Sequence, residues 1–210
     1  MRAFINTLWP IHCLLCDSIC INKKFICNDC YITLPIYSTS TNNICNTLSF
    51  DNTYALFNYA PPISSLIAKL KFQGDLSVAK LFSQYWIDYF LNKKSLPELI
   101  IPVPLHHKRL KERGFNQALE IAKPIGNYFK IPVDTKSCVR IKNTQAQSSL
   151  TAKKRINNVS NAFKLDYSIS VKHVAILDDV MTTGNTVSEM GYLLKEAGIG
   201  RVDVWCCARA

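Results

Sequence analysis

An acidic pair that precedes a run of hydroxyl residues is the first feature of this chain that could do chemistry. Asp178 and Asp179 follow the apolar residues Val174 to Leu177, and a turn from Val180 to Thr186 comes next. The apolar run predicts a buried strand, and Asn185 to Ala197 predicts a helix. A turn from strand to helix directs backbone N–H groups and the positive end of the helix dipole toward an anion. We therefore predict a phosphate site in this turn.

The side chains of the turn extend this prediction to a sugar phosphate. Three threonines supply hydroxyl donors, and a glycine lets the backbone approach the phosphate. Carboxylates at the end of a strand can accept hydrogen bonds from the 2- and 3-hydroxyls of a ribose. The alternatives are a Mg²⁺ or phosphoacceptor pair of another α/β family and a simple strand-end cap. The candidate site residues are Asp178, Asp179, Val180, Met181, Thr182, Thr183, Gly184, Asn185 and Thr186.

The segment DDVMTTGNT, residues 178 to 186, resembles the signature of the type I phosphoribosyltransferases. In that signature an acidic pair and a hydrophobic residue precede a TTG-x-T loop. The resemblance implies that Asp178 and Asp179 bind the ribose of phosphoribosyl pyrophosphate, and that Thr182 to Thr186 bind its 5-phosphate. This ligand also carries a diphosphate, usually with Mg²⁺. Fixed cations must face the diphosphate as it departs, because it leaves as an anion.

Basic residues that could face a diphosphate follow a second apolar stretch. Leu99 to Val103 predicts a short buried strand, and a cluster of cations begins three residues after it. Arginine can hold phosphate oxygens through two parallel hydrogen bonds, which makes this cluster a suitable second half of the site. The candidates on the diphosphate side are His106, Lys108, Arg109 and Arg113.

The net charge of +10 is concentrated in one segment of the chain. Residues 106 to 160 hold twelve Lys or Arg against three acidic residues, which accounts for nine of these ten charges. A solvated basic surface that aids solubility is one interpretation. The concentration of the excess favours the other, a polyanionic partner.

Two Cys-x-x-Cys pairs near the N-terminus predict a metal site. Their spacing suits two knuckles that supply four thiolates to a tetrahedral Zn²⁺. Such a closed site is structural, and it would fold a module too short for a core of its own. A disulfide framework is the alternative, but nine cysteines are an odd number and no export signal precedes them. The predicted ligands are Cys13, Cys16, Cys27 and Cys30, with Cys20 or His12 as substitutes.

The elements that must position these residues alternate along the chain. Helices are expected over Ile63 to Leu70 and Val78 to Phe90, with a break at Gly74, and over Asn116 to Phe129. A last strand is expected over Val202 to Ala208. Strands that alternate with helices predict an α/β fold with a parallel sheet.

The chain divides by composition into a small and a large part. We predict a Cys-rich module with its linker over residues 1–50 and the main domain over 51–210. The apolar stretches are far shorter than the roughly 20 residues of a membrane-spanning helix. The N-terminus lacks the pattern of a signal peptide. We expect a cytoplasmic protein without membrane insertion.

Further segments are similar to the competence protein F (ComF) family. They are YAPPISSLIAKLKFQGD (59–75), PVPL…RGFNQA (102–118), Thr144-x-x-Gln147…Leu150…Lys154-Arg155…Asn158-x-x-x-Ala162-Phe163, and Ala208-Arg209. The similarity spans nearly the whole chain, in order. It implies a type I phosphoribosyltransferase-like domain with an N-terminal zinc ribbon. It also implies a role with incoming single-stranded DNA during natural transformation, where other DNA-uptake proteins are further partners.

The same resemblance suggests roles for the segment from Arg140 to Arg155. In related transferases the corresponding segment closes over the diphosphate. The candidates for this closure or for DNA contact are Arg140, Lys142, Lys153, Lys154 and Arg155. Many members of the family carry a second ribbon, but only Cys45 stands in that region here, so we expect one metal. Cys138, Cys206 and Cys207 are expected to be buried or incidental.

Two functions from different classes fit these features. The first is a competence protein that handles single-stranded DNA and binds phosphoribosyl pyrophosphate. The second is an active phosphoribosyltransferase of nucleotide or amine metabolism. The sequence provides the donor half of such an enzyme, but it identifies no base-recognition group and no general base. A third hypothesis is that DNA and the diphosphate compete for the same cations, which would make the small molecule a regulator of DNA binding.

Overall fold

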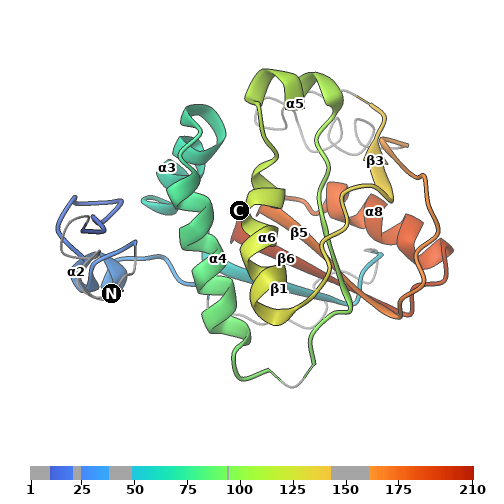
Figure 1. The fold of residues 1–210 in the computed structure, drawn as a ribbon, viewed down its shortest axis with the longest axis horizontal. Coiled ribbons are helices and arrows are strands. Elements are labelled where there is room, and N and C mark those ends of the chain that lie inside the picture. Colours follow the sequence, from blue (N-terminus) through green and yellow to red (C-terminus); the bar gives the residue numbers. More distant parts are fainter. Residues whose placement is uncertain (1–9, 21–24, 38–48, 94, 143–160) are drawn as a thin grey trace, which may run out of the picture.

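A four-stranded parallel sheet forms the centre of the computed structural model, which describes residues 10–20, 25–37, 49–93, 95–142 and 161–210. The strand order is β1-β6-β5-β2, and neighbouring strands are parallel (Figure 1). Because parallel strands end at the same edge, the residues that follow β2 and β5 meet there. The strands are β1 (Asn52–Asn58), β2 (Leu99–Pro102), β5 (His173–Met181) and β6 (Arg201–Arg209).

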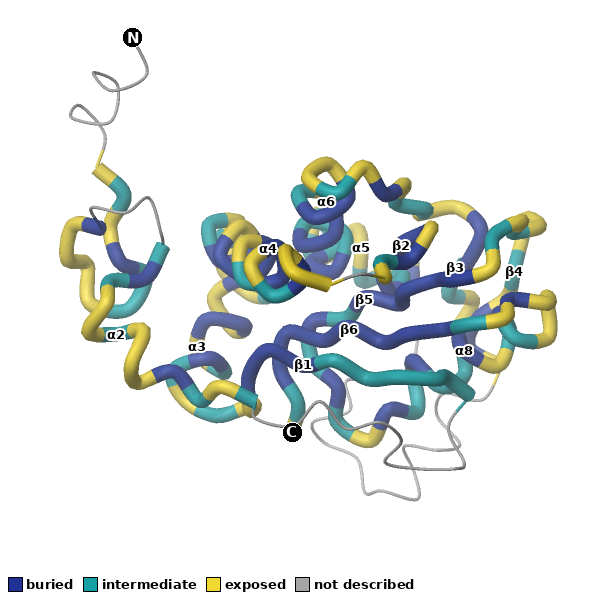
Figure 2. The backbone as a smooth tube through the Cα atoms, turned by 90° about the horizontal axis from the view of Figure 1, so that it is seen from below, coloured by how far each residue is buried: buried dark blue, intermediate teal, exposed yellow. Residues whose placement is uncertain are grey.

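Helices cover both faces of the sheet, because successive strand residues point to opposite faces. Ala175 and Leu177 of β5 belong to one buried core, whereas Val174 and Ile176 belong to a second core on the other face. Figure 2 shows α4 and α6 on one side of the strands and α8 on the other. The helices of the first face are α3 (Ile63–Ala68), α4 (Leu76–Phe90) and α6 (Gln117–Phe129), and the second face carries α8 (Asn185–Glu196).

Polar side chains set the starts of two of these helices. The side chain of Asn116 accepts hydrogen bonds from the N–H groups of Ala118 and Leu119, at 2.9 and 3.3 Å, and α6 begins there. Asp75 caps α4 in the same way through the N–H of Ser77, at 3.0 Å. These caps satisfy N–H groups that have no partner within the helix. The predicted start of a helix at Asn116 is therefore confirmed.

The break predicted at Gly74 is confirmed, but the helix before it is longer than expected. After α3 the chain forms a five-residue π-helix, η1 (Lys69–Gln73), which ends at Gly74 with φ of 70°. Glycine accepts this left-handed conformation without strain. A π-helix is rare and frequently lies at a functional site. This element positions Lys69 and Lys71, which are discussed below.

Several short elements were not expected from the sequence. They are the edge strand β1, the helix that follows β2, and an antiparallel hairpin beside α8. The hairpin strands have three residues each, β1 has four apolar residues in a row without alternation, and α5 contains one apolar residue. The helix is α5 (His107–Arg113), and the hairpin consists of β3 (Cys138–Arg140) and β4 (Phe163–Leu165).

The N-terminal module contains the Cys-x-x-Cys turns and a short helix, α2 (Asn28–Ile32), and its contacts with the main domain include a backbone hydrogen bond and a pair of stacked rings. The Tyr37 N–H donates to the carbonyl of Leu56 in β1 at 2.9 Å. The rings of Tyr31 and Tyr85 stack with their centroids 6.2 Å apart. The predicted fold class, a parallel sheet flanked by helices with a small N-terminal cysteine module, is confirmed. None of the described helices has the length and hydropathy needed to cross a membrane.

Candidate functional site

The acidic pair lies inside β5 and not beyond its end. The strand continues to Met181 because Val180 and Met181 pair with Ala208 and Arg209 of β6. The expected strand end at Leu177 was therefore wrong, and so was a turn that begins at Val180. The pair lies near the carboxyl end of β5, which is a central strand of the sheet. Open α/β sheets bind ligands at this edge.

The turn after β5 is short and leads directly into α8. Gly184 occupies the position before the helix with φ of 78°, a conformation that favours glycine. Gly184 has no side chain that could cap α8, and the Ser188 N–H bonds to the carbonyl of Gly184 at 2.8 Å. The first N–H groups of a helix have no partner within it, and helix starts are therefore suited to anions. Thr182 is half-buried in the turn before α8, and Thr183 is exposed.

The two carboxyl groups each use one oxygen for the backbone. Asp178 Oδ1 accepts the N–H of Asp179 at 2.8 Å, and Asp179 Oδ1 accepts the N–H of Val180 at 3.0 Å. By strand alternation Asp178 belongs to the face of α8, and Asp179 belongs to the face of α4 and α6. Each carboxyl group therefore retains further lone pairs for other contacts.

Lys71 forms an ion pair with Asp179 from the opposite side of the site. Its Nζ lies 2.7 Å from Asp179 Oδ2, and the two side chains are 24% and 4% exposed. Burial lowers the pKa of Lys71, but the charge of Asp179 more than offsets this and raises it overall. Burial likewise raises the pKa of Asp179, and Lys71 lowers it overall. Both partners are therefore ionised at neutral pH.

Asp178 differs from its neighbour in charge. Burial and the nearby charge of Asp179 raise the pKa of Asp178 to about 8. Two carboxyl groups at close range do not both ionise readily, because like charges repel in a medium of low dielectric. At neutral pH the pair therefore holds one proton, mainly on Asp178.

Arginines from two different elements face the acidic pair. Arg113, at the end of α5, interacts electrostatically with Asp179, and its Nη1 donates to Gln117 Oε1 at 2.6 Å. Arg140, in β3, interacts with Asp178 and with Arg109 of α5. The structure thus brings Arg140 close to Arg109 and Arg113 near the strand end, although Arg140 is distant from them in the sequence.

His106 and Lys108 have different surroundings from these arginines. The buried His106 caps α5, since its Nδ1 accepts the N–H of Lys108 at 3.3 Å. Burial and the charges of His107 and Lys108 lower the pKa of His106, so its ring is neutral at neutral pH. The predicted place of His106 on the diphosphate side stays a prediction. Lys108 is exposed on the outer side of α5.

The hairpin of β3 and β4 carries the candidates for closure or DNA contact. The guanidinium of Arg140 lies over the ring of Phe163, 5.3 Å from its centroid, and Lys142 is exposed. Glu189 of α8 attaches this hairpin, because its Oε1 accepts the N–H of Ala162 at 2.6 Å. Lys153, Lys154 and Arg155 lie outside the described residues, as does the motif that begins at Thr144.

Lys71 and Glu189 are site residues that the sequence analysis did not include. Lys71 lies in the segment 59–75, which supported the family resemblance but was given no role. Lys71 stands three residues before Gly74, where a helix is expected to end, and residues near such an end were candidates for the site. Glu189 sits inside an ordinary amphipathic helix, where a carboxylate carries no signal of its own.

The four predicted metal ligands lie close together. The Sγ atoms of Cys13, Cys16, Cys27 and Cys30 are all within 4.8 Å of one another, and those of Cys16 and Cys27 are 3.6 Å apart. A tetrahedral site with Zn–S bonds of about 2.3 Å has sulfurs about 3.8 Å apart, so the cluster fits this ion. Hydrogen bonds from Ser18 lower the pKa of Cys16 to about 6, which favours a thiolate there.

The other described cysteines have no place in this cluster. Cys20 is buried nearby, but burial raises the pKa of its thiol. His12 directs its Nδ1 to the carbonyl of Asp17 at 2.8 Å. Neither substitute ligand joins the four sulfurs. Cys138, Cys206 and Cys207 are buried, as expected, and Cys45 lies outside the described residues.

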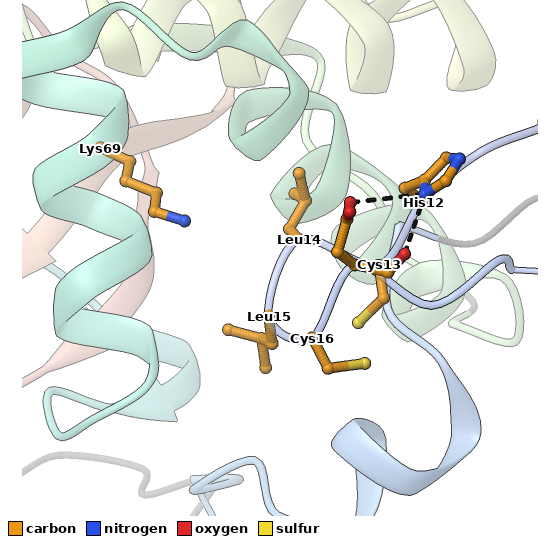
Figure 3. Close-up of a pocket in the computed structure, with 7 residues that line it drawn as sticks. His12, Cys13, Leu14, Leu15, Cys16 and Lys69 are labelled. Atoms are coloured by element: carbon orange, nitrogen blue, oxygen red, sulfur yellow. Dashed lines mark hydrogen bonds and ion pairs between the residues drawn. The ribbon is translucent and has the colours of Figure 1, made fainter.

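A groove of about 500 Å³ separates the cysteine module from η1. It is lined by His12 to Asp17 on one side and by Lys69 on the other (Figure 3). Lys69 and Lys71 are thus neighbours in one helix with different surroundings. Lys69 faces the module, whereas Lys71 faces the acidic pair.

Comparison with known proteins shows relatives over most of the chain. It is 35% identical to competence protein F of Haemophilus influenzae, in an alignment that covers 88% of this chain and 84% of that protein. It is 33% identical to DNA utilization protein YhgH of Shigella flexneri, over 96% of this chain and 91% of the other. Competence protein ComFC of Streptococcus pneumoniae is 25% identical, over 74% and 67%. No family model matches the chain.

The solved structures that match this chain include two phosphoribosyltransferases. Adenine phosphoribosyltransferase from Leishmania donovani has 12% identity and a TM-score of 0.46, covering 80% of this chain and 71% of that one. Hypoxanthine phosphoribosyltransferase from Trypanosoma cruzi has 15% identity and a TM-score of 0.36, covering 61% and 60%.

Proposed function

Because the chain belongs to the competence protein F (ComF) family, we propose that it handles incoming single-stranded DNA during natural transformation and binds phosphoribosyl pyrophosphate. The observation that carries this proposal is the convergence at the end of β5. A carboxyl pair, a helix start that suits an anion, and cations from three elements meet at one edge of the sheet. A ribose that bears phosphates at both ends matches this order of groups.

Each part of the ligand has a matching part of the site. The turn from Thr182 to Gly184 and the start of α8 would hold the 5-phosphate. Asp178 and Asp179 would bind the ribose hydroxyls. Arginines 109, 113 and 140 would face the diphosphate, where paired N–H donors suit phosphate oxygens. Mg²⁺ would enter with the diphosphate, since this ion prefers phosphate and carboxylate oxygens.

The proposed DNA surface is α5 together with β3, and not the whole basic segment. Lys108 and Lys111 are exposed on α5, next to the arginines of the site. Lys130, by contrast, ends α6, which runs back from the carboxyl edge toward the other edge of the sheet. Lys123 is already paired with Glu120 at 2.7 Å. A strand of DNA along α5 would lie beside the sugar-phosphate site.

Binding of a fluorescent oligonucleotide at several salt concentrations tests the DNA proposal. The affinity should fall steeply with salt, because phosphate contacts release counterions. The double variant Lys108→Ala/Lys111→Ala should bind at least about tenfold more weakly and with a shallower salt dependence. Lys80→Ala/Lys172→Ala removes the same charge from exposed positions elsewhere and should bind as the wild type does. Equal losses in the two double variants would contradict the proposed surface.

We further propose that the cysteine module holds one structural Zn²⁺ in the reducing cytoplasm. Four thiolates without an open position would stabilise the module and leave no coordination site for chemistry. The module lies beside η1, so it could present a surface to DNA or to another DNA-uptake protein. Its metal content is the subject of a prediction below.

An active phosphoribosyltransferase of nucleotide or amine metabolism is the second candidate function. The same donor site would serve such an enzyme, and a protonated Asp178 would be a proton donor close to a bound ribose. Pyrophosphate release from phosphoribosyl pyrophosphate and Mg²⁺, with a panel of purine and pyrimidine bases and ammonia, distinguishes the two. Release that depends on one acceptor supports the enzyme. Binding without release for every acceptor supports a ligand-binding protein.

A further inference from the structure

A phenylalanine of η1 extends into solvent. The side chain of Phe72 is 80% exposed, and no other aromatic side chain among the described residues is as exposed. Single apolar side chains are common on protein surfaces. This one, however, has no polar atom to offer water, and it belongs to a helical element whose Leu70 is fully buried. A fixed backbone therefore presents the ring to solvent.

Two lysines share this element with the ring. Lys69 is exposed and lines the groove beside the cysteine module. Lys71 lies on the side of the acidic pair, where Arg113 of α5 adds its charge. The surroundings of Phe72 thus combine an exposed ring with positive charge. Proteins that bind single-stranded nucleic acids use this combination, because the cations hold phosphates while bases stack on the ring.

The end of η1 adjoins the end of α5, the helix of the proposed DNA surface. A Cβ placed on Gly74 would lie 3.8 Å from Cε1 of Phe115, which follows α5. The charges of Lys71 and Arg113 also act on each other. In Figure 1, α5 and the segment that joins α3 to α4 lie at the same end of the molecule. A strand of DNA that follows α5 to its end would therefore reach η1 next.

We propose that Phe72 is a stacking site for one base of single-stranded DNA, with the phosphates beside that base held by Lys69 and by the cations of α5. The inference rests on the proposed function, since it concerns the DNA that the protein is proposed to bind. It adds a contact with a base to a surface that otherwise offers contacts with phosphates. Because the bases of a duplex are already paired and stacked, the ring selects single strands.

The ring and the lysines contribute to binding in ways that can be separated. Loss of one aromatic stacking partner should weaken binding of a single strand at least about fivefold. A neutral ring releases no counterions from DNA, so its loss should leave the salt dependence of binding unchanged. Loss of a lysine that contacts phosphate makes this dependence shallower.

Fluorescence anisotropy with three labelled nucleic acids tests the inference. They are an oligothymidylate, an abasic strand of the same length and a duplex of the same length, each titrated at several salt concentrations. The proteins are the wild type, Phe72→Ala, Phe72→Trp and Tyr128→Ala. Phe72→Trp keeps a ring on which a base can stack. Tyr128→Ala is the matched control, since it removes a ring that is 55% exposed near the end of α6.

The expected result is that Phe72→Ala binds the oligothymidylate at least about fivefold more weakly at every salt concentration, while the other two variants bind it as the wild type does. The abasic strand and the duplex should bind the wild type and Phe72→Ala equally. The inference is wrong if Phe72→Ala binds the oligothymidylate as the wild type does, a result that would leave the ring to a protein partner. It is also wrong if this variant loses affinity for all three nucleic acids alike.

These results are distinct from a failure of the DNA proposal itself. In both cases that overturn the inference, salt-dependent binding of the wild type would still support the surface on α5. If the wild type binds none of the three nucleic acids at low salt, the proposed DNA function fails and the inference fails with it.

Discussion

Asp178 and Asp179 are adjacent in the chain, but their surroundings give them different charges. Asp179 is paired with Lys71, which keeps its pKa below the usual value. For Asp178, the effects of burial and of the neighbouring Asp179 charge outweigh that of Lys71, and they raise its pKa to about 8. Buried carboxyl groups of this kind are typical of binding and catalytic sites. The cost of this arrangement should be measurable as a loss of stability.

We predict that Asp178→Asn stabilises the protein and that the gain grows with pH. The pKa of Asp178 rises from 3.8 in the unfolded chain to about 8 in the folded protein. Between these values the folded protein binds more protons than the unfolded chain, so its stability falls as pH rises. Removing the carboxylate should raise the thermal midpoint at about pH 8 by roughly 2–4 °C or more, and by less at about pH 5.

Asp179→Asn provides the contrast at the neighbouring position. It leaves the buried Lys71 ammonium without its partner, which costs stability even though one carboxylate is removed. Thermal unfolding of both variants over a pH series compares them directly. A destabilised Asp178→Asn at alkaline pH, or a stabilised Asp179→Asn, would show that the charges are assigned to the wrong residues.

At the residue scale, the sequence predicted the groups that are close together in the chain. The acidic pair and the threonines form one continuous segment, and the four cysteines form two pairs with regular spacing. Lys71 was not predicted, because its contact with Asp179 depends on the packing of η1 against the sheet. The neutral state of His106 was also out of reach, since burial and neighbouring cations cause it.

At the element scale, the turn before α8 depends on the left-handed Gly184. We predict that Gly184→Ala weakens binding of phosphoribosyl pyrophosphate by at least about tenfold, because its added Cβ strains the turn that receives the phosphate. Gly198→Ala is a matched control, since Gly198 has φ of 88° at the far end of α8 and open space around it.

Both glycine variants should lose about 1 kcal/mol of stability, because alanine is strained in the left-handed region. Only Gly184→Ala should lose affinity for the ligand, as measured by calorimetry. If Gly198→Ala lost affinity to the same degree, the effect would report general destabilisation and not the phosphate turn.

The folding of the cysteine module should depend on its bound metal. We predict one Zn²⁺ per chain by elemental analysis, and a large loss of this metal in Cys16→Ser. Cys20→Ser should retain it, since Cys20 lies outside the four-sulfur cluster. Equal metal content in the two variants would contradict the assigned ligands.

Long elements were easier to predict than short ones. The helices α4, α6 and α8 show clear hydrophobic periods, and the structure has them near the expected positions. The end of β5 was predicted four residues too early, because Asp178 and Asp179 interrupt its apolar run while β6 continues to pair with it. The helix α5 contains few apolar residues, so the sequence predicted its basic residues but not the helix that carries them.

At the scale of the whole molecule, the alternation of strands and helices predicted the parallel sheet. It did not predict the strand order, which depends on how β1 and β6 pair across the length of the main domain. Nor did it place the cysteine module beside η1, with a groove between them. As a result, the sequence identified two sites but not their distance or the helix that lies between them.

The shared cations lead to a prediction about both ligands together. Arg109, Arg113 and Arg140 surround the acidic pair and border the proposed DNA surface. We therefore expect phosphoribosyl pyrophosphate with Mg²⁺ to weaken binding of a labelled oligonucleotide, because both require the same cations. Ribose 5-phosphate lacks the diphosphate and should compete far less. Simultaneous binding of DNA and the diphosphate ligand without loss of affinity would contradict this coupling.

The central claim is a sugar-phosphate site at the end of β5, and one titration tests it most directly. Calorimetry of the wild type with phosphoribosyl pyrophosphate and Mg²⁺ should give one site per chain with a dissociation constant below about 1 mM. The affinity should fall at least about tenfold in Gly184→Ala and remain near that of the wild type in Gly198→Ala. A wild type that takes up no ligand, or equal affinity in the two glycine variants, would contradict the account.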